Sequence, residues 1–256
     1  MNEVLRRLPE ADWNESPAEL LASVFEAARS TLRVADPFAP LRAEIDATLG
    51  VLAGEFRETL EASEDPFALA TRAAAAANLV DELVFERFAR QDPRDLFEAA
   101  LGQDFAAGSP AELSEALQGA EGVVYLCDNA GELHFDGLLM EQFLQAGKQV
   151  TALVRGAGLL HDATAAEATC LPAAVEVVVL KEGQLGMPLV GRSSDLGAAL
   201  ESAQVVISKG ASNYETFHSD HHDVVHLLRA KCGPVSNSLG VVPGSLVLHR
   251  VPPTAT

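Results

Sequence analysis

The spacing of apolar residues divides the chain into two parts. Residues 1 to about 118 place apolar side chains at helical intervals, most clearly in segments 16–32, 40–62 and 65–88. From about residue 121 onward, short runs of Val, Ile and Leu alternate with helical segments. Near-continuous apolar strands that alternate with helices are typical of a parallel sheet covered on both faces. The pattern predicts an α/β fold of three layers (α/β/α) with a mostly parallel sheet, preceded by an all-helical N-terminal region.

The second part contains all the strands that we expect. They lie in five apolar segments: 122–127, 148–154, 175–180, 204–208 and 245–250. Helices are expected next to them, in segments 131–147, 162–170, 193–203 and 213–232. We therefore divide the chain into a helical domain, 1–118, and an α/β domain, 119–256. Since no glycine- or serine-rich linker separates them, we expect the two to pack as one body.

Polar residues follow three of the predicted strands, at the point where each strand ends. Asp128 and Asn129 follow the first strand, and Asp162 lies shortly after the second. A third group surrounds the end of the fourth strand and consists of Ser208, Lys209, Gly210, Asn213 and Glu215. Because ligands bind outside the carboxyl ends of parallel strands, we expect these residues to line one site.

The residue types at these strand ends suit a divalent cation and a phosphate group. The oxygens of Asp128, Asn129 and Asp162 are hard ligands of the kind that bind Mg²⁺ or Mn²⁺. Gly131 lets the backbone turn sharply, and the start of the following helix would direct amide groups toward an anion. Lys209 would add a compact positive charge for a phosphate.

Each of these residues alone also has a purely structural interpretation. Asp128 and Asn129 can cap the helix that follows them, as Asx residues at strand-to-helix junctions do. Capping is favoured for Asp162, which opens a good helix start, and Lys209 alone is most simply a solvated loop lysine. The position of all three groups at one edge of the sheet favours a site.

Other motifs in the second part carry less weight. A haloacid-dehalogenase-type phosphatase has a second aspartate two residues after its nucleophile, but this position is Ala130. Residues 156–161 begin like a dinucleotide fingerprint, with His161 in place of the third glycine. Residues 186–193 have P-loop spacing, but Arg192 replaces the lysine and no strand leads into them.

Three histidines share helical i,i+4 spacing, namely His218, His222 and His226. Such spacing occurs in zinc sites, but no glutamate completes an H-E-x-x-H pattern here and the segment is very polar on one side. A solvated helix face is therefore favoured over a dedicated zinc site, and the role of the segment stays open. Cys127, beside Asp128, is interpreted as a small buried hydrophobe rather than a nucleophile.

Two polar residues interrupt the alanine-rich helix predicted in the first part. Asn78 and Asp81 lie three residues apart and therefore on one helix face. In such apolar surroundings they point to a cavity or to a neighbouring element. A hydrogen bond between helices is slightly favoured by the sequence alone.

Composition narrows the class of partner. The formal net charge of −19 argues against nucleic acid, which needs a basic surface, and against an anionic membrane. The N-terminus has no signal-peptide core, and the most apolar helical run, 68–80, is too short to span a bilayer. Three cysteines without Cys-x-x-Cys spacing are typical of reduced thiols. We expect a cytoplasmic protein, and the sequence leaves its oligomeric state undefined.

Several of these stretches together resemble the metal-dependent damage-control phosphatases, also called domain of unknown function 89. They are the segments 127–132, 161–164, 208–215 and 229–248. Segment 65–82 is also similar to the family's N-terminal pattern, with Ala77 where glycine is usual. The resemblance extends over roughly residues 36 to 248, and the combination in this order is specific although each piece alone is not.

The resemblance implies roles for individual residues. Asp128, Asn129 and Asp162 would hold a divalent metal, Mn²⁺, Mg²⁺, Co²⁺ or Ni²⁺. The catalytic group would comprise Asp128, Asp162, Lys209 and Glu132, with Lys209 on the phosphate. The substrate-binding group would comprise Asn78, Asp81, Ser208, Gly210, Asn213 and Glu215. Two departures bear on this assignment: His161 stands where asparagine is common and could tune metal preference, and Ala77 could narrow the pocket.

The expected activity is metal-assisted hydrolysis of a small phosphomonoester, such as a sugar phosphate or a damaged phosphometabolite. The cation would polarise the phosphoryl group, and Lys209 would neutralise charge on its oxygens. Either Glu132 or Asp162 would orient or deprotonate the attacking water. Two alternatives stay open: a carboxyl methyltransferase that uses S-adenosylmethionine, although its usual glycine-rich loop is absent, and a non-catalytic protein that binds a phosphometabolite.

Overall fold

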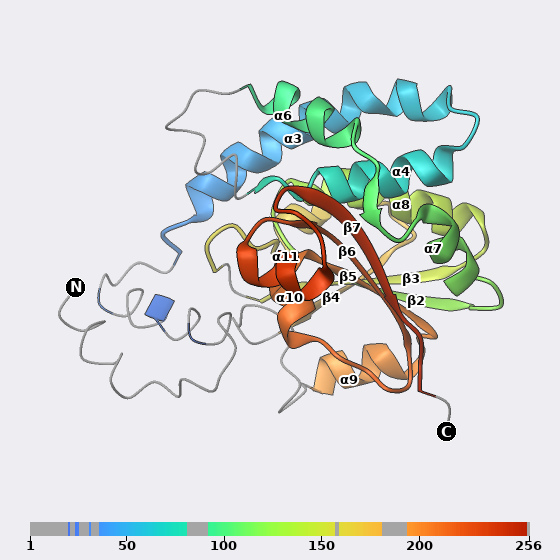
Figure 1. Ribbon diagram of the computed structural model, residues 1–256. Helices are drawn as coiled ribbons and strands as arrows, with labels where there is room; N and C mark the ends of the chain where they lie inside the picture. Colours follow the sequence, from blue (N-terminus) through green and yellow to red (C-terminus); the bar gives the residue numbers. More distant parts are fainter. Residues whose placement is uncertain are drawn as a thin grey trace.

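The computed structural model of the chain describes residues 20, 24–25, 31, 36–80, 92–156, 159–180 and 194–254. It confirms the predicted fold class: a seven-stranded, mostly parallel sheet carries helices on both faces, and a helical region precedes it (Figure 1). Within the described residues, no helix combines the length and the apolar character that crossing a membrane requires.

The sheet has the strand order β1-β7-β6-β5-β2-β3-β4. All neighbours are parallel except β6 and β7, which are antiparallel. The strands are β1 (Phe105–Ala107), β2 (Gly122–Leu126), β3 (Gln149–Arg155), β4 (Glu176–Leu180), β5 (Val205–Lys209), β6 (Asp223–Ala230) and β7 (Ser245–Val251).

Helices connect and cover these strands. Those that precede β2 are α3 (Ala39–Glu61), α4 (Pro66–Ala76), α6 (Pro93–Leu101) and α7 (Pro110–Ala116). Those that follow it are α8 (Glu132–Gln145), the short 3₁₀ helix η2 (Glu167–Cys170), α9 (Ser194–Glu201), α10 (Gly210–Thr216) and α11 (Gly233–Leu239).

Alternating side chains of each strand serve two different cores, because successive residues of a strand point to opposite faces. On β2, Tyr125 belongs to the larger core, which packs against α3, α4, α6, α7 and α8. Its neighbour Leu126 belongs to a second core under α9. A third apolar cluster, which includes Leu228 and Val235, lies under α10 and α11. The buried sheet therefore needs apolar residues on both faces, as the strand pattern indicated.

The segment predicted as one long helix, 213–232, folds differently. Helix α10 ends at Thr216, and β6 begins at Asp223, so His226 lies in a strand and the helical spacing of the three histidines was misleading. The β-branched, apolar run that starts at Val224 lies between β5 and β7 and completes the backbone hydrogen bonds of both. Because β6 pairs with two neighbouring strands, the segment forms a strand despite the helical spacing of its histidines.

The alanine-rich helix of the first part is shorter than predicted. Asp65 caps its start by accepting a hydrogen bond from the nitrogen of Ala68 at 3.0 Å, as expected for an Asp-Pro helix start. Helix α4 then ends at Ala76, and Asn78 lies in the turn that follows. The prediction that Asn78 and Asp81 share one helix face was wrong for Asn78, and Asp81 lies outside the described residues.

The helical region also contributes a strand that the sequence pattern did not predict. The three residues of β1, Phe105–Ala107, pair with β7 at one edge of the sheet. Three residues are too few to show a clear alternation, which explains why the pattern missed them. The division of the chain at residues 118 and 119 stays a prediction.

Helix α3 is fastened to α8 by polar contacts at its surface. Arg57 of α3 forms two hydrogen bonds with Glu141 of α8, both 2.8 Å long. Nearby, the Nε2 atom of His134 lies 3.1 Å from a carboxylate oxygen of Asp46. The proximity of Asp46, followed by that of Cys170, raises the pKa of His134 to about 10. These contacts hold α8, whose first turn reaches the candidate site.

This raised pKa makes the α3–α8 contact dependent on pH. A histidine whose pKa is about 6.5 when unfolded and about 10 when folded stabilises the protein fully below about pH 6.5. Its contribution is lost as the pH rises toward 10. We expect the difference in free energy of unfolding between wild type and His134→Gln to shrink steadily over this range in urea titrations. A difference that stays constant with pH would contradict the assignment.

Candidate active site at the strand ends

The three residues predicted to bind a metal meet at one edge of the sheet, because β2, β3 and β5 run parallel to one another. Asp128 and Asn129 continue the chain beyond β2, and a short antiparallel bridge joins Asn129 to Asp162. Two main-chain hydrogen bonds, 2.7 and 2.9 Å from nitrogen to oxygen, flank this bridge. The backbone itself therefore fixes Asn129 and Asp162 opposite each other and beside Asp128.

The Asp128 carboxylate is buried and held by two amides. Its Oδ2 atom accepts hydrogen bonds from the Nδ2 atoms of Asn78, at 2.9 Å, and Asn129, at 2.8 Å. Gly210 passes directly beside it with a φ angle of +77°, and a Cβ atom there would lie 1.8 Å from Oδ2. Only glycine suits both the backbone angle and the space. Gly210, predicted to bind substrate, therefore makes room for the carboxylate.

Glu132, the first residue of α8, is fully buried. Its Oε1 atom accepts from Nδ2 of Asn78 at 2.7 Å and from Nδ2 of Asn129 at 2.6 Å. Its Oε2 atom accepts from the ammonium of Lys209 at 2.9 Å. Both carboxylate oxygens are thus engaged with protein donors, and the same two amides connect Glu132 to Asp128.

Lys209, the last residue of β5, is also fully buried. Its ammonium donates to the carbonyl of Ala74 at 2.9 Å, to Glu132 at 2.9 Å and to Oδ1 of Asp136 at 2.6 Å. Burial lowers the pKa of Lys209, but the two carboxylates outweigh this effect and raise the pKa above its usual value. Since an ammonium has three protons, all of them are donated within the protein. The predicted contact of Lys209 with phosphate stays a prediction.

Asp136 is a member of this network that the sequence analysis missed. It lies one helical turn after Glu132 on α8, is fully buried, and accepts a hydrogen bond from the hydroxyl of Tyr125 at 2.7 Å. Burial raises the pKa of Asp136 to about 6, against the opposing effect of Lys209. The signal in the sequence was two carboxylates at i,i+4 spacing in an otherwise apolar helix.

Arg155, the last residue of β3, was missed as well. Its guanidinium is buried and donates to Oδ1 of Asn213 at 2.9 Å, and its Nε atom lies 3.7 Å from Oδ2 of Asp162. Burial lowers the pKa of Arg155, and the charges of Asp162 and Asp128 oppose this. Asn213 also donates to the carbonyls of Lys209, at 2.8 Å, and Cys127, at 3.2 Å. The sequence signal that could have identified Arg155 was the presence of an arginine at the end of an apolar strand.

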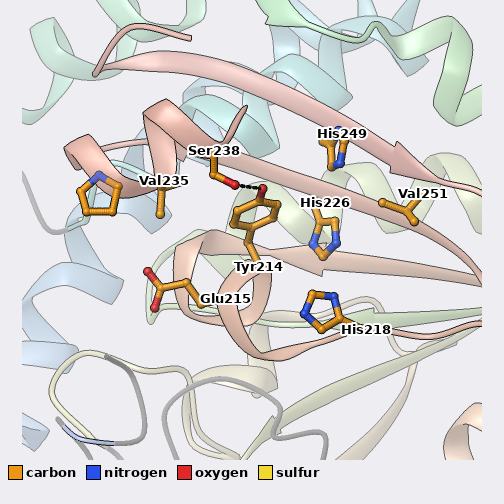
Figure 2. Close-up of a pocket in the computed structure, with 9 residues that line it drawn as sticks. Tyr214, Glu215, His218, His226, Val235, Ser238, His249 and Val251 are labelled. Atoms are coloured by element: carbon orange, nitrogen blue, oxygen red, sulfur yellow. Dashed lines mark hydrogen bonds between the residues drawn. The ribbon is translucent and has the colours of Figure 1, made fainter. Parts of the chain in front are cut away.

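The remaining predicted residues are not part of this network in the same way. Ser208 is buried in β5, and its hydroxyl has no hydrogen-bond partner among the described residues. Glu215 lies two residues beyond Asn213 and lines a separate cavity with Tyr214 (Figure 2). Asp81 lies outside the described residues. Cys127 is buried, as expected, and burial raises the pKa of its thiol well above the usual value.

The charges of the network fit a divalent cation better than no cation. Among the residues that the structure describes, four buried carboxylates share this network with two buried cations, so the carboxylates exceed the cations by two; the six are Asp128, Glu132, Asp136, Asp162, Arg155 and Lys209. Within the described part of the chain, no three His, Cys, Asp or Glu side chains converge as metal ligands. The predicted set has two carboxylates and one amide. Because the Asn129 nitrogen donates to Asp128 and Glu132, its amide oxygen points away from them and suits a hard cation.

Comparisons with known proteins show which sequences this chain is similar to. The family model described as the damage-control phosphatase ARMT1-like domain matches residues 1–247. A protein of Archaeoglobus fulgidus named damage-control phosphatase is 29% identical over 239 residues, which cover 91% of this chain and 82% of that protein. A damage-control phosphatase of Pyrococcus horikoshii is 31% identical over 189 residues, which cover 72% of this chain and 65% of that protein.

The fold has a counterpart among solved structures. The crystal structure of a DUF89 family protein from Pyrococcus horikoshii superposes with a TM-score of 0.85 at 26% sequence identity. The match covers 96% of this chain and 87% of the other. Sequence and structure thus agree over nearly the whole chain, which is more than the residues 36 to 248 over which the motifs indicated a resemblance. The chain belongs to the family described as the damage-control phosphatase ARMT1-like domain.

Proposed function

We propose that this damage-control phosphatase family member hydrolyses small phosphomonoesters with a divalent cation held by Asp128, Asn129 and Asp162. The observation that carries the proposal is the main-chain bridge between Asn129 and Asp162, next to Asp128, in a network whose described residues carry excess negative charge. Mn²⁺, Mg²⁺, Co²⁺ or Ni²⁺ would suit this set. Such a cation polarises a phosphoryl group and lowers the pKa of a bound water.

The names of the relatives support the substrate class. Two curated relatives are named damage-control phosphatases, which favours a small phosphorylated metabolite, such as a sugar phosphate or a damaged phosphometabolite. The acidic composition of the chain, with a net charge of −19, disfavours a polyanionic nucleic acid as substrate.

The two candidate bases differ in how their oxygens are used. Both oxygens of Glu132 already accept hydrogen bonds from Asn78, Asn129 and Lys209. We therefore assign to Glu132 the positioning of those amides. Asp162 lies at the strand end, 5% exposed, and is assigned the orientation or deprotonation of the attacking water.

The two buried cations also receive different roles. Arg155 lies beside Asp162, and a guanidinium is well shaped for phosphate oxygens. We assign to Arg155 the neutralisation of charge on the phosphoryl group. Lys209 donates all three protons to protein acceptors, which supports an indirect role: it balances Glu132 and Asp136, and through Glu132 it fixes the ligand-bearing loop.

The first test removes a metal ligand. With p-nitrophenyl phosphate as substrate, we expect chelator-treated wild type to be inactive and to recover with at least one of Mn²⁺, Mg²⁺, Co²⁺ and Ni²⁺. Asp128→Ala should lose activity by about a hundredfold or more. It should also lose the increase in thermal unfolding midpoint that the metal gives wild type, because a ligand stabilises only a state that binds it.

Asp104→Ala is the matched control, because the carboxylate of Asp104 is 95% exposed and lies 3.6 Å from the guanidinium of Arg72. It should behave as wild type in both measurements. Full turnover in Asp128→Ala, or an equal metal-induced shift of its unfolding midpoint, would refute the assigned ligand set.

The second test separates an indirect role of Lys209 from a direct contact with phosphate. Lys209→Met leaves Glu132 and Asp136 buried without their counter-charge, so we expect it to lower the free energy of unfolding by about 3 to 5 kcal/mol. Lys148→Met is the matched control, since Lys148 donates to one main-chain carbonyl, that of Ala120, at 2.7 Å. Its loss should be about 1 kcal/mol. Measured by urea titration, a fully stable Lys209→Met protein without turnover would instead indicate direct contact.

A further inference from the structure

A cavity of about 450 Å³ lies on the face of the sheet that carries α10 and α11 (Figure 2). We call it the histidine cavity; its lining includes Tyr214, Glu215, His218, His226, His249 and Val251. Its volume falls within the range of pockets that bind small molecules. Helix α10 lies between this cavity and the carboxylate network, because Asn213 faces the network while Tyr214 and Glu215 line the cavity.

The histidine cavity has an aromatic wall, in which the Tyr214 ring stands nearly perpendicular to two roughly parallel imidazoles. His226 of β6 and His249 of β7 are paired in the antiparallel register, and their rings lie 6.1 Å apart at an interplanar angle of 18°. The ring of Tyr214 meets His226 edge-on at 5.1 Å, and its hydroxyl is fixed 2.9 Å from that of Ser238. Preformed aromatic walls of this kind favour a planar ring as ligand.

His226 supplies the main polar group of the cavity. It is 2% exposed, and its Nδ1 atom has no hydrogen-bond partner among the described residues. Burial, followed by the charges of His249 and His218, lowers the pKa of His226 to about 3. Its imidazole is therefore uncharged at neutral pH and has one donor and one acceptor nitrogen. Leaving a buried polar atom without a partner is costly, and a ligand that bonds to it would remove this cost.

The charges of the side chains that line the histidine cavity do not favour the phosphorylated substrates proposed for the active site. No lysine or arginine occurs among the described residues that line the cavity, and Glu215 contributes a carboxylate. Burial raises the pKa of Glu215, and a carboxylate in this position accepts hydrogen bonds and repels anions. The cavity is thus suited to an uncharged ligand that carries hydrogen-bond donors.

We propose that the histidine cavity is a second ligand site, separate from the carboxylate network, which binds a small planar nitrogen heterocycle bearing an amino group. An amino group next to a ring nitrogen presents a donor and an acceptor side by side. Such an edge complements Nδ1 of His226 in either tautomer, and the amino group also complements Glu215. The planar ring stacks on the imidazole pair and meets the nearly perpendicular Tyr214 ring at its edge.

The test measures binding of adenine as the probe to the full chain by calorimetric titration, with benzoate as a planar anionic control. Adenine should bind with a dissociation constant of about 1 mM or tighter, and benzoate should not bind. His226→Phe keeps a flat ring but removes Nδ1, so its affinity for adenine should fall about tenfold. In wild type, the side-chain nitrogen resonances of His226 should shift on addition of adenine.

A second variant tests the proposal independently, in case the His226→Phe protein does not fold. Val251 lines the cavity, is 38% exposed and takes no part in the carboxylate network. Val251→Trp should fill the cavity and abolish adenine binding while leaving the hydrolysis of p-nitrophenyl phosphate unchanged. Asp128→Ala should bind adenine as wild type does, which separates this proposal from the proposed catalytic function.

Three results would overturn the proposal. The first is an absence of both heat and resonance shifts at adenine concentrations of about 10 mM. The second is unchanged affinity in Val251→Trp, or in a folded His226→Phe protein. The third is displacement of adenine by inorganic phosphate, or loss of adenine binding in Asp128→Ala, since either would place the ligand in the carboxylate network instead.

Discussion

The buried ammonium of Lys209 is the interaction on which the rest of the site depends. Removing a charge from water costs several kcal/mol unless partners compensate for it. Lys209, on β5, is compensated by a main-chain carbonyl of α4 and two carboxylates of α8. One of these, Glu132, fixes the amides of Asn78 and Asn129, and the same amides hold Asp128. One charged side chain thereby ties two helices and two strand ends into a single hydrogen-bonded unit.

The helical region therefore contributes to the hydrogen-bond network of the candidate site and not only to the cover of the sheet. Asn78 comes from the turn after α4 and reaches both carboxylates, while the carbonyl of Ala74 accepts from Lys209. As far as the described residues go, the network contains more buried negative than positive charge. Such an excess is unfavourable in a folded protein unless a cation offsets it. The same excess that supports a metal site would also make the metal contribute to the stability of the folded chain.

The sequence was sufficient for five of the seven strands and for the meeting of Asp128 and Asp162, because parallel neighbouring strands end on the same side of the sheet. It was not sufficient for Asp136 and Arg155. Both are charged residues in apolar elements, and only the packing of α8 and β3 shows which groups they face. The spacing around His226 indicated a helix because local pattern takes no account of the two strands that pair with β6. The predictions that failed were those that depend on burial and on strand pairing, because both are properties of the tertiary structure.

The central claim is that one divalent cation is held where β2 and β3 end. The most direct measurement is anomalous X-ray diffraction from crystals grown with Mn²⁺, with data collected on both sides of the manganese absorption edge. The account predicts a manganese peak bound by oxygens of Asp128, Asn129 and Asp162. A peak bound by other residues, or no peak at this strand edge in a well-ordered crystal saturated with Mn²⁺, would contradict it.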